Sequence, residues 1–133
     1  MSQENIELVR GLLTAIQEKR PDDVLPHLHF AFEIVPSPTF PETEILRGPT
    51  GFMRFMSRWP EMFSDYEFTH DRFWDAGEQV VVALHERARA ARGSGITLDD
   101  RFAHVWTLQD GLVSKIQIFD DQAEALDAVG LNE

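Results

Sequence analysis

Apolar residues near the N-terminus follow a helical period. They recur every three or four positions, with two more widening the stripe: Ile6, Leu8, Val9, Leu12, Leu13 and Ile16. This spacing predicts an amphipathic helix over residues 3–19 that packs on a core. Pro21, followed by two aspartates, suits the start of a second, short helix that reaches about His29.

A strand and a helix are expected next. Residues 30–35 are predicted to form a strand with apolar side chains on both faces. Three prolines within 36–41 end this strand and begin a loop through Arg47. Gly48-Pro49 then opens a helix, because proline is tolerated at the first helical position. Pro60 is expected to end it, since the residue before a proline avoids the α region.

The pattern in the second half of the chain is that of β-structure. Strands are predicted over 66–74 and 80–90, followed by a hairpin between Leu98 and Asp120. Asp110-Gly111 favours a two-residue type I′ turn, because both positions then need positive φ. Such a turn places Gln109 opposite Leu112 and, continuing along the ladder, Arg101 opposite Asp120.

A short terminal helix follows the hairpin. Asp121 is a plausible N-cap with Glu124 three residues on, and Gly130 suits the left-handed position after the helix. The element order predicts an α+β fold in one domain over residues 1–133. A bent antiparallel sheet would wrap over the N-terminal helices, with a short C-terminal helix.

Composition narrows the set of partners and cellular locations. The net charge is −11, which argues against nucleic acid or an anionic membrane as partner, since both are polyanions. There is no cysteine, so disulfides and thiolate chemistry are excluded. The N-terminus lacks the apolar core of a signal peptide, and no run approaches the ~20 apolar residues that span a bilayer. We therefore expect a cytoplasmic protein.

The region from Leu98 to Leu131 carries a family resemblance. Its Val-Trp-Thr strand core, Asp-Gly turn, strand-ending Asp and closing helix supply the matching residues: Val105, Trp106, Thr107, Asp110, Gly111, Asp120, Glu124, Ala125, Leu126, Gly130 and Leu131. In order and spacing they resemble the SnoaL-like (polyketide cyclase-like) branch of the nuclear transport factor 2-like and ketosteroid isomerase-like superfamily. The resemblance extends to nearly the full length, because the remaining elements come in a compatible order.

The resemblance implies a cone-shaped roll with a pocket between a concave sheet and its helices. It also implies a homodimer through the other sheet face, and cofactor-independent isomerase, cyclase, dehydratase or epoxide hydrolase activity. Trp106 and its same-face neighbours are expected to supply an apolar outer face for that dimer. A fold of this kind hosts unrelated activities, so activity has to be argued from the site.

Three residues are candidates for catalysis. Asp120 ends an apolar strand where a SnoaL-like cyclase has its proton-accepting aspartate, and burial would raise its pKa towards a useful range. Its alternative role is to cap the last helix. His104 is a natural proton shuttle, but it shares a face with Asp120 only if the hairpin register shifts by one; otherwise it is a core or interface histidine. Arg101, with Asp99, resembles by residue type the Asp-Arg-Asp set of limonene-type epoxide hydrolases, or forms a structural salt bridge.

Six residues are candidates for ligand contact, with ordinary packing as their alternative role: Phe52, Phe55, Trp59, His85, Trp106 and Ile118. We expect no metal, because the His27-x-His29 pair has no third ligand nearby, and no cofactor. Two functions follow from the sequence. One is proton-transfer chemistry on a small apolar or polycyclic molecule, and the other is a non-catalytic ligand-binding or dimeric interaction module.

Overall fold

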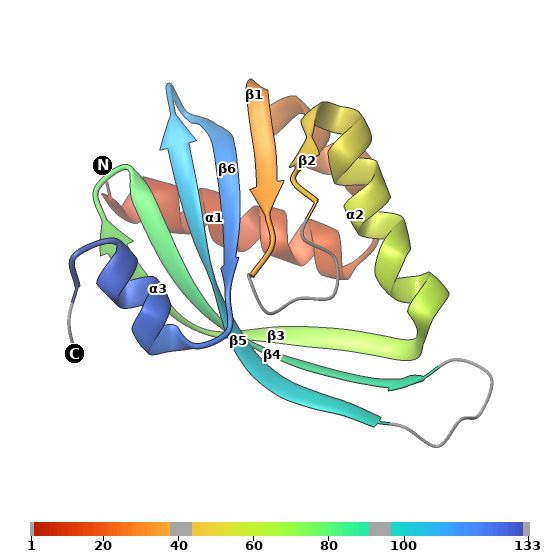
Figure 1. Cartoon of the computed structure of the whole chain (residues 1–133). Coiled ribbons are helices and arrows are strands. Elements are labelled where there is room, and N and C mark those ends of the chain that lie inside the picture. The colour runs from red at the N-terminus through yellow and green to blue at the C-terminus, as the bar shows by residue number, and fades with distance from the viewer. Residues whose placement is uncertain (1, 38–43, 91–96, 132–133) are drawn as a thin grey trace.

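The computed structural model describes residues 2–37, 44–90 and 97–131, and within these it leaves out the side chains of residues 2, 59–65 and 90. The fold is α+β, as the sequence predicts: one sheet is combined with a helix at each end of the chain and a third helix in its middle (Figure 1). The helices are α1 (Ser2–Gln17), α2 (Gly48–Met62) and α3 (Gln122–Ala128), with short 3-10 turns η1 (Pro21–Asp23) and η2 (Leu25–His27). The strands are β1 (Leu28–Val35), β2 (Leu46–Arg47), β3 (Phe63–Ala76), β4 (Gln79–Ala90), β5 (Thr97–Gln109) and β6 (Leu112–Phe119).

The six strands form one sheet in the order β2-β1-β6-β5-β4-β3. Neighbouring strands are antiparallel except β1 and β6, which run parallel. The sheet is therefore mixed, where the sequence predicted an antiparallel one. No tight turn joins β1 to β6, so hairpin geometry does not fix their relative direction.

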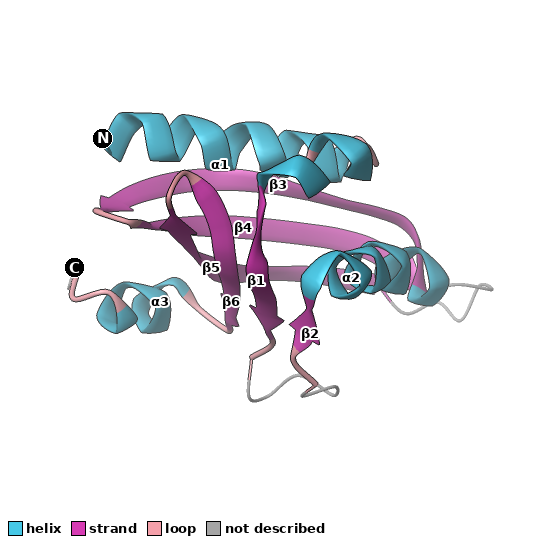
Figure 2. Ribbon diagram, turned by 90° about the horizontal axis from the view of Figure 1, so that it is seen from above, coloured by secondary structure: helices cyan, strands magenta, loops and turns pink. Residues whose placement is uncertain are grey.

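The long strands bend, which gives the sheet an enclosing side and an outer side. Helices α1 and α2 lie on the enclosing side and α3 lies on the outer side (Figures 1 and 2). The buried residues divide accordingly. The larger cluster joins Val9 and Leu13 of α1 to Phe52 of α2 and to the sheet, while the smaller joins Leu126 of α3 to Val105. This division defines the side on which a pocket can form.

The structure differs from the prediction at two prolines, Pro60 and Pro21. Helix α2 continues past Pro60 to Met62, so Pro60 lies in its last turn and does not terminate it. The segment after Pro21 forms two 3-10 turns and not one short helix, with a second proline, Pro26, in η2. Proline removes a backbone donor and limits the length of a regular helix, which accounts for the short turns.

The predicted turn at Asp110-Gly111 is confirmed, but most of the register beyond it is wrong. Both turn residues have positive φ (54° and 77°), and Gln109 pairs with Leu112. The register then shifts between Leu108 and Thr107, so that Thr107 pairs with Lys115 and not with Ser114. The bulge adds one residue to β6, and a one-residue slip changes which side chains face each other. His104 therefore pairs with Ile118.

The closing helix has the predicted ends. The side chain of Asp121 accepts a hydrogen bond from the backbone N–H of Glu124 at 2.9 Å, as an N-cap does. Gly130 has φ 80°, and the N–H of Leu131 donates to the carbonyl of Leu126. These bonds define the two ends of α3, and its buried residues Ala125 and Leu126 pack on the outer face of the sheet. Across the described ranges, helices are too short or too polar to cross a bilayer.

Candidate functional site

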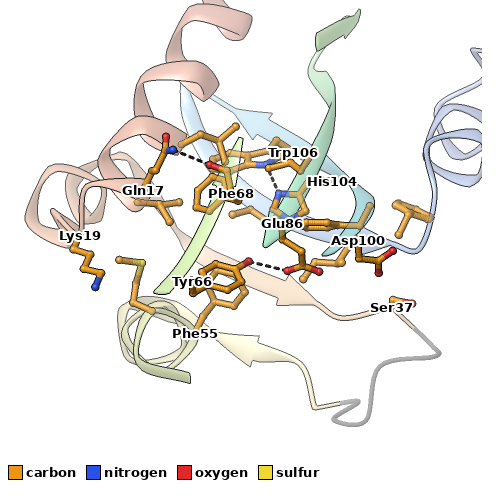
Figure 3. Close-up of a pocket in the computed structure, with 18 of the residues that line it drawn as sticks. Gln17, Lys19, Ser37, Phe55, Tyr66, Phe68, Glu86, Asp100, His104 and Trp106 are labelled. Atoms are coloured by element: carbon orange, nitrogen blue, oxygen red, sulfur yellow. Dashed lines mark hydrogen bonds between the residues drawn. The ribbon is translucent and has the colours of Figure 1, made fainter. Parts of the chain in front are cut away.

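A cavity of about 680 Å³ lies between the enclosing side of the sheet and helices α1 and α2. This is the size of small-molecule sites in proteins. Figure 3 shows the polar side chains distributed around it, from Gln17 at the end of α1 and Lys19 just after it to Ser37 after β1. The apolar wall consists of Leu13, Ile16, Met53, Phe55, Met56, Phe68, Leu84, Phe102, Trp106, Ile116, Ile118 and Phe119.

Strand β5 runs from the mouth of this cavity to its floor. Four same-face residues of β5 line the cavity, and burial increases along them in the order Asp100, Phe102, His104, Trp106. Asp100 is exposed, whereas Trp106 is 0% exposed. The cavity therefore has an acidic mouth and an apolar, aromatic floor.

Glu86 of β4 is the buried carboxyl of the cavity. It is only 9% exposed, and its Oε1 accepts a hydrogen bond of 2.8 Å from the hydroxyl of Tyr66 on β3 (Figure 3). Burial raises the pKa of Glu86, and the charge of Asp100 adds to the rise, while the Tyr66 hydrogen bond opposes it. Burial also raises the pKa of Tyr66, so its phenol stays protonated and remains a donor. A raised carboxyl pKa suits exchange of a proton near neutral pH.

The strand pairing explains why Asp100 affects Glu86. The two residues are direct partners across β4 and β5, and both line the cavity. Like charges at opposed positions repel, which disfavours ionisation of the more buried member. Asp100 is exposed and contacts solvent at the mouth. The pair therefore places one buried carboxyl with a raised pKa beside one exposed carboxyl.

His104 lies deeper, next to Trp106. The indole Nε1–H of Trp106 donates to Nδ1 of His104 at 3.2 Å, and His104 is 6% exposed. Burial lowers the pKa of His104 to about 3. The imidazole is therefore neutral at physiological pH, and it is poorly suited to the proton-shuttle role predicted for it. It does share the cavity with Asp120, the arrangement that a register shift of one was expected to give.

Asp120 lies at the rim of the cavity and is exposed. Its Oδ1 accepts a hydrogen bond of 2.5 Å from the hydroxyl of Ser37. The cap of α3 is supplied by its neighbour Asp121. Asp120 thus lies neither in an apolar environment nor in the capping position.

Arg101 does not face Asp120, so that prediction is wrong. Arg101 alternates with Asp100 and Phe102 along β5 and so points to the outer side of the sheet, with a side chain 73% exposed that contacts Asp71 at 2.9 Å, while the bulge in β6 leaves Asp120 on the cavity side. Asp99 also lies on that side, at 2.5 Å from Nε2 of His85. The Asp-Arg-Asp set is therefore not assembled. His85 is absent from the cavity wall, since it alternates with Leu84 and Glu86 along β4.

The other predicted ligand contacts divide between cavity and core. Phe55, Trp106 and Ile118 line the cavity. Phe52 is 0% exposed and packs edge-on against Phe32, so it is a core residue. The side chain of Trp59 lies outside the described residues. Trp106 was expected on an outer dimer face, but it faces the enclosing side.

Sequence reasoning missed Glu86 and Tyr66. The signal for Glu86 was the period-2 alternation of β4, where Val80, Val82 and Leu84 are buried and Glu86 is the next residue on that face. Residues 80–84 are apolar on both faces, which hid the periodicity.

For metal binding, the described residues contain no group of three or more His, Asp or Glu side chains placed to hold an ion.

The fold is a bent sheet with helices on its enclosing side and a cavity between them. Several solved structures share this fold over nearly their whole length. An NTF2-like protein from Burkholderia thailandensis has a TM-score of 0.80 at 22% identity, covering 94% of this chain and 95% of that one. A putative SnoaL-like polyketide cyclase from Jannaschia sp. CCS1 has a TM-score of 0.77 at 20% identity, covering 99% and 95%. TerC, co-crystallised with polyporic acid, has a TM-score of 0.75 at 20% identity, covering 94% and 97%.

The family follows from the sequence itself. The profile of the SnoaL-like domain matches residues 9–116, and the chain belongs to this family. The resemblance predicted from residues 98–131 is thereby confirmed. Among proteins of curated function, none matches the chain in sequence.

Proposed function

We propose that this protein binds a small apolar molecule in its cavity and that Glu86 transfers a proton to or from it without a cofactor. The observation that carries the proposal is a carboxyl buried in a largely apolar cavity, with a raised pKa and an orienting hydrogen bond from Tyr66. A desolvated carboxylate is a stronger base than a solvated one, and a positioned base typically accelerates proton transfer about 10²–10⁴-fold. The co-crystallisation of TerC, which shares this fold, with polyporic acid supports an organic ligand for the present protein.

The site replaces the catalytic set expected from the sequence. Glu86 takes the role of base in place of Asp120, because Glu86 is buried and Asp120 is exposed at the rim. Asp100 and Asp120 keep the mouth acidic, which disfavours entry of anionic molecules. A neutral substrate with an acidic C–H bond fits these features best.

The test is deuterium incorporation into 2-tetralone, a neutral bicyclic ketone, in D₂O. The Glu86 carboxylate would remove a proton from the carbon beside the carbonyl to give the enolate, and a deuteron would return to that carbon. We expect the wild-type protein to accelerate exchange above buffer, measured by ¹H NMR. Glu86→Gln should reduce the protein-catalysed rate at least about 100-fold.

Glu67→Gln is the matched control, since Glu67 is exposed on β3 and absent from the cavity wall. It should leave the rate unchanged. Equal rates for Glu86→Gln and wild type would refute the role of Glu86. Binding of the ketone without exchange would favour the alternative, a non-catalytic ligand-binding module.

A further inference from the structure

The floor of the cavity contains a hydrogen-bond donor that the proton-transfer proposal does not use. His104 and Trp106 are two residues apart on β5 and both line the cavity. Their side chains are joined by the hydrogen bond from the indole Nε1–H to Nδ1 of His104 (Figure 3). This bond determines which ring nitrogen of His104 carries its hydrogen.

The indole nitrogen is a donor and never an acceptor. Nδ1 of His104 must therefore present a lone pair to Trp106. Because burial also keeps the ring neutral at physiological pH, its single N–H is on Nε2. Trp106 thus selects one tautomer of His104.

The Nε2–H group reaches the open cavity. Within the described residues, the hydrogen bond from Trp106 is the one that His104 makes, and no buried side-chain nitrogen or oxygen lacks a partner. An unbonded Nε2 is therefore an accessible atom at the cavity surface. The surroundings of this nitrogen are apolar. The ring of Phe102 packs edge-on against His104, with 5.3 Å between the ring centroids, and Val82 and Ile118 are the strand partners of His104.

We infer that His104, held in the Nε2–H tautomer by Trp106, recognises a neutral acceptor oxygen of the ligand, such as the carbonyl of a ketone. A ligand without an acceptor would cover this N–H and leave it without a partner, which is unfavourable. The carboxyls of Asp100, Asp120 and Glu86 outnumber Lys19, which also lines the cavity, so an uncharged oxygen is favoured over a carboxylate. Leu84 and Phe102 lie between Glu86 and His104 on the cavity face and would contact the apolar body of the ligand.

This inference deepens the proposed function by naming the class of substrate, and it rests on the same cavity. Its test compares binding of 2-tetralone and tetralin, which differ only in a carbonyl in place of a methylene group. Affinity is measured by titration followed by protein NMR shifts. We expect the wild type to bind the ketone about tenfold more tightly, the contribution of one hydrogen bond in an apolar site.

Two variants assign the preference to His104. His104→Phe keeps a flat ring without a donor and should bind both compounds equally. Trp106→Phe removes the indole N–H, so that part of His104 takes the Nδ1–H form and the preference falls. ¹⁵N NMR of labelled histidine should show the Nε2–H tautomer in the wild type and a mixture in Trp106→Phe. Trp74→Phe, which changes a tryptophan packed in the outer-face cluster, should alter neither readout.

Equal wild-type affinities, no measurable binding of the ketone, or the Nδ1–H tautomer in the wild type would each overturn this inference. Its failure is distinguishable from failure of the proton transfer. Ketone preference that persists in Glu86→Gln without any catalysed exchange would support recognition by His104 and reject the role of Glu86. Catalysed exchange without ketone preference would support the role of Glu86 and reject recognition by His104.

Discussion

At the scale of single residues, Glu86 and His104 are both buried, and burial shifts their pKa values in opposite directions. Burial raises the pKa of Glu86 and lowers that of His104, because it favours the neutral form of each. Glu86 is thus able to hold a proton above the usual carboxyl range, and His104 stays uncharged. The cavity can therefore enclose an apolar molecule without enclosing a full charge at its floor.

Tyr66→Phe should raise the pKa of Glu86 further. The Tyr66 hydroxyl donates to the carboxyl and stabilises its charged form, so its removal takes away the larger of the two effects that oppose burial and Asp100, the other being the nearby His85. A ¹³C NMR titration of labelled glutamate should show the Glu86 signal titrating at higher pH in the variant. Glu86→Gln identifies the signal by its absence. A pKa that is unchanged or lower in Tyr66→Phe would contradict this assignment of the hydrogen bond.

His104 should make the protein less stable in acid. Its folded pKa, about 3, is below the unfolded value of 6.5, so its contribution is present above pH 6.5 and is lost as pH falls towards 3. The free energy of unfolding should fall by up to about 1.4 kcal/mol per pH unit from this one group. Urea unfolding between pH 4 and 7 measures the slope.

His104→Gln should reduce that slope, since glutamine does not titrate. His27→Gln, a partly exposed histidine in η2, is the matched control and should retain it. An undiminished slope in His104→Gln would mean that other groups account for the acid sensitivity.

At the scale of elements, one bulge determines which residues share the cavity. Asp110-Gly111 defines the turn, and the extra residue in β6 then shifts the register by one. As a result His104 and Ile118 are partners, and Asp120 lies on the cavity side with His104 and not with Arg101, which points outward to Asp71. The chemistry of the site is therefore a product of strand register as much as of residue type.

Helix α2 lies close to Leu46 of β2 at Gly51. A Cβ at this position would lie 2.7 Å from the backbone carbonyl carbon of Leu46, which is closer than atoms normally approach. Gly51→Ala should destabilise the protein by about 1–3 kcal/mol, the usual range for overpacking. Thermal unfolding followed by circular dichroism measures the change.

Gly11→Ala is the opposite case and the control. Gly11 is exposed within α1, and a Cβ there would meet no atom within 4 Å. Alanine should stabilise this helix by about 0.5–1 kcal/mol, since it loses less conformational freedom on folding. A Gly51→Ala variant that is as stable as the wild type, or more stable, would refute the close contact between α2 and β2.

Local signals made most elements predictable, whereas non-local pairing did not. The Asp110-Gly111 turn, the Asp121 cap and the Gly130 terminus each depend on a few adjacent residues, and all are confirmed. The parallel alignment of β1 with β6 and the bulge in β6 depend on contacts between distant segments. Glu86 was missed for a related reason, because only the burial of the whole sheet face reveals that it points inward.

At the scale of the whole molecule, the two sides of the sheet differ in character. The enclosing side is apolar around the cavity. On the outer side, α3 covers Val81, Ala103 and Val105. The outer side beyond α3 is polar, with an ion pair between Arg101 and Asp71 and a hydrogen bond between His85 and Asp99. An association through this side would be less apolar than the sequence predicted.

The homodimer remains a prediction from the family resemblance. Trp106 no longer supports it, because that side chain lies at the floor of the cavity. Light scattering at micromolar concentration should give twice the chain mass of 15.2 kDa. A measured mass of one chain would refute the dimer.

The position of β6 between β1 and β5 has a consequence for biosynthesis. During translation, β1 and the helices that flank it are made long before β6, so the parallel pair cannot form until residues 112–119 have left the ribosome. Until then the part of the cavity wall that contains Ile116 and Ile118 is missing, and the strand edges of β1 and β5 that pair with β6 are uncovered. Contacts this distant in sequence slow folding. The nascent chain is therefore most exposed to aggregation, and most dependent on chaperones, just before β6 is complete.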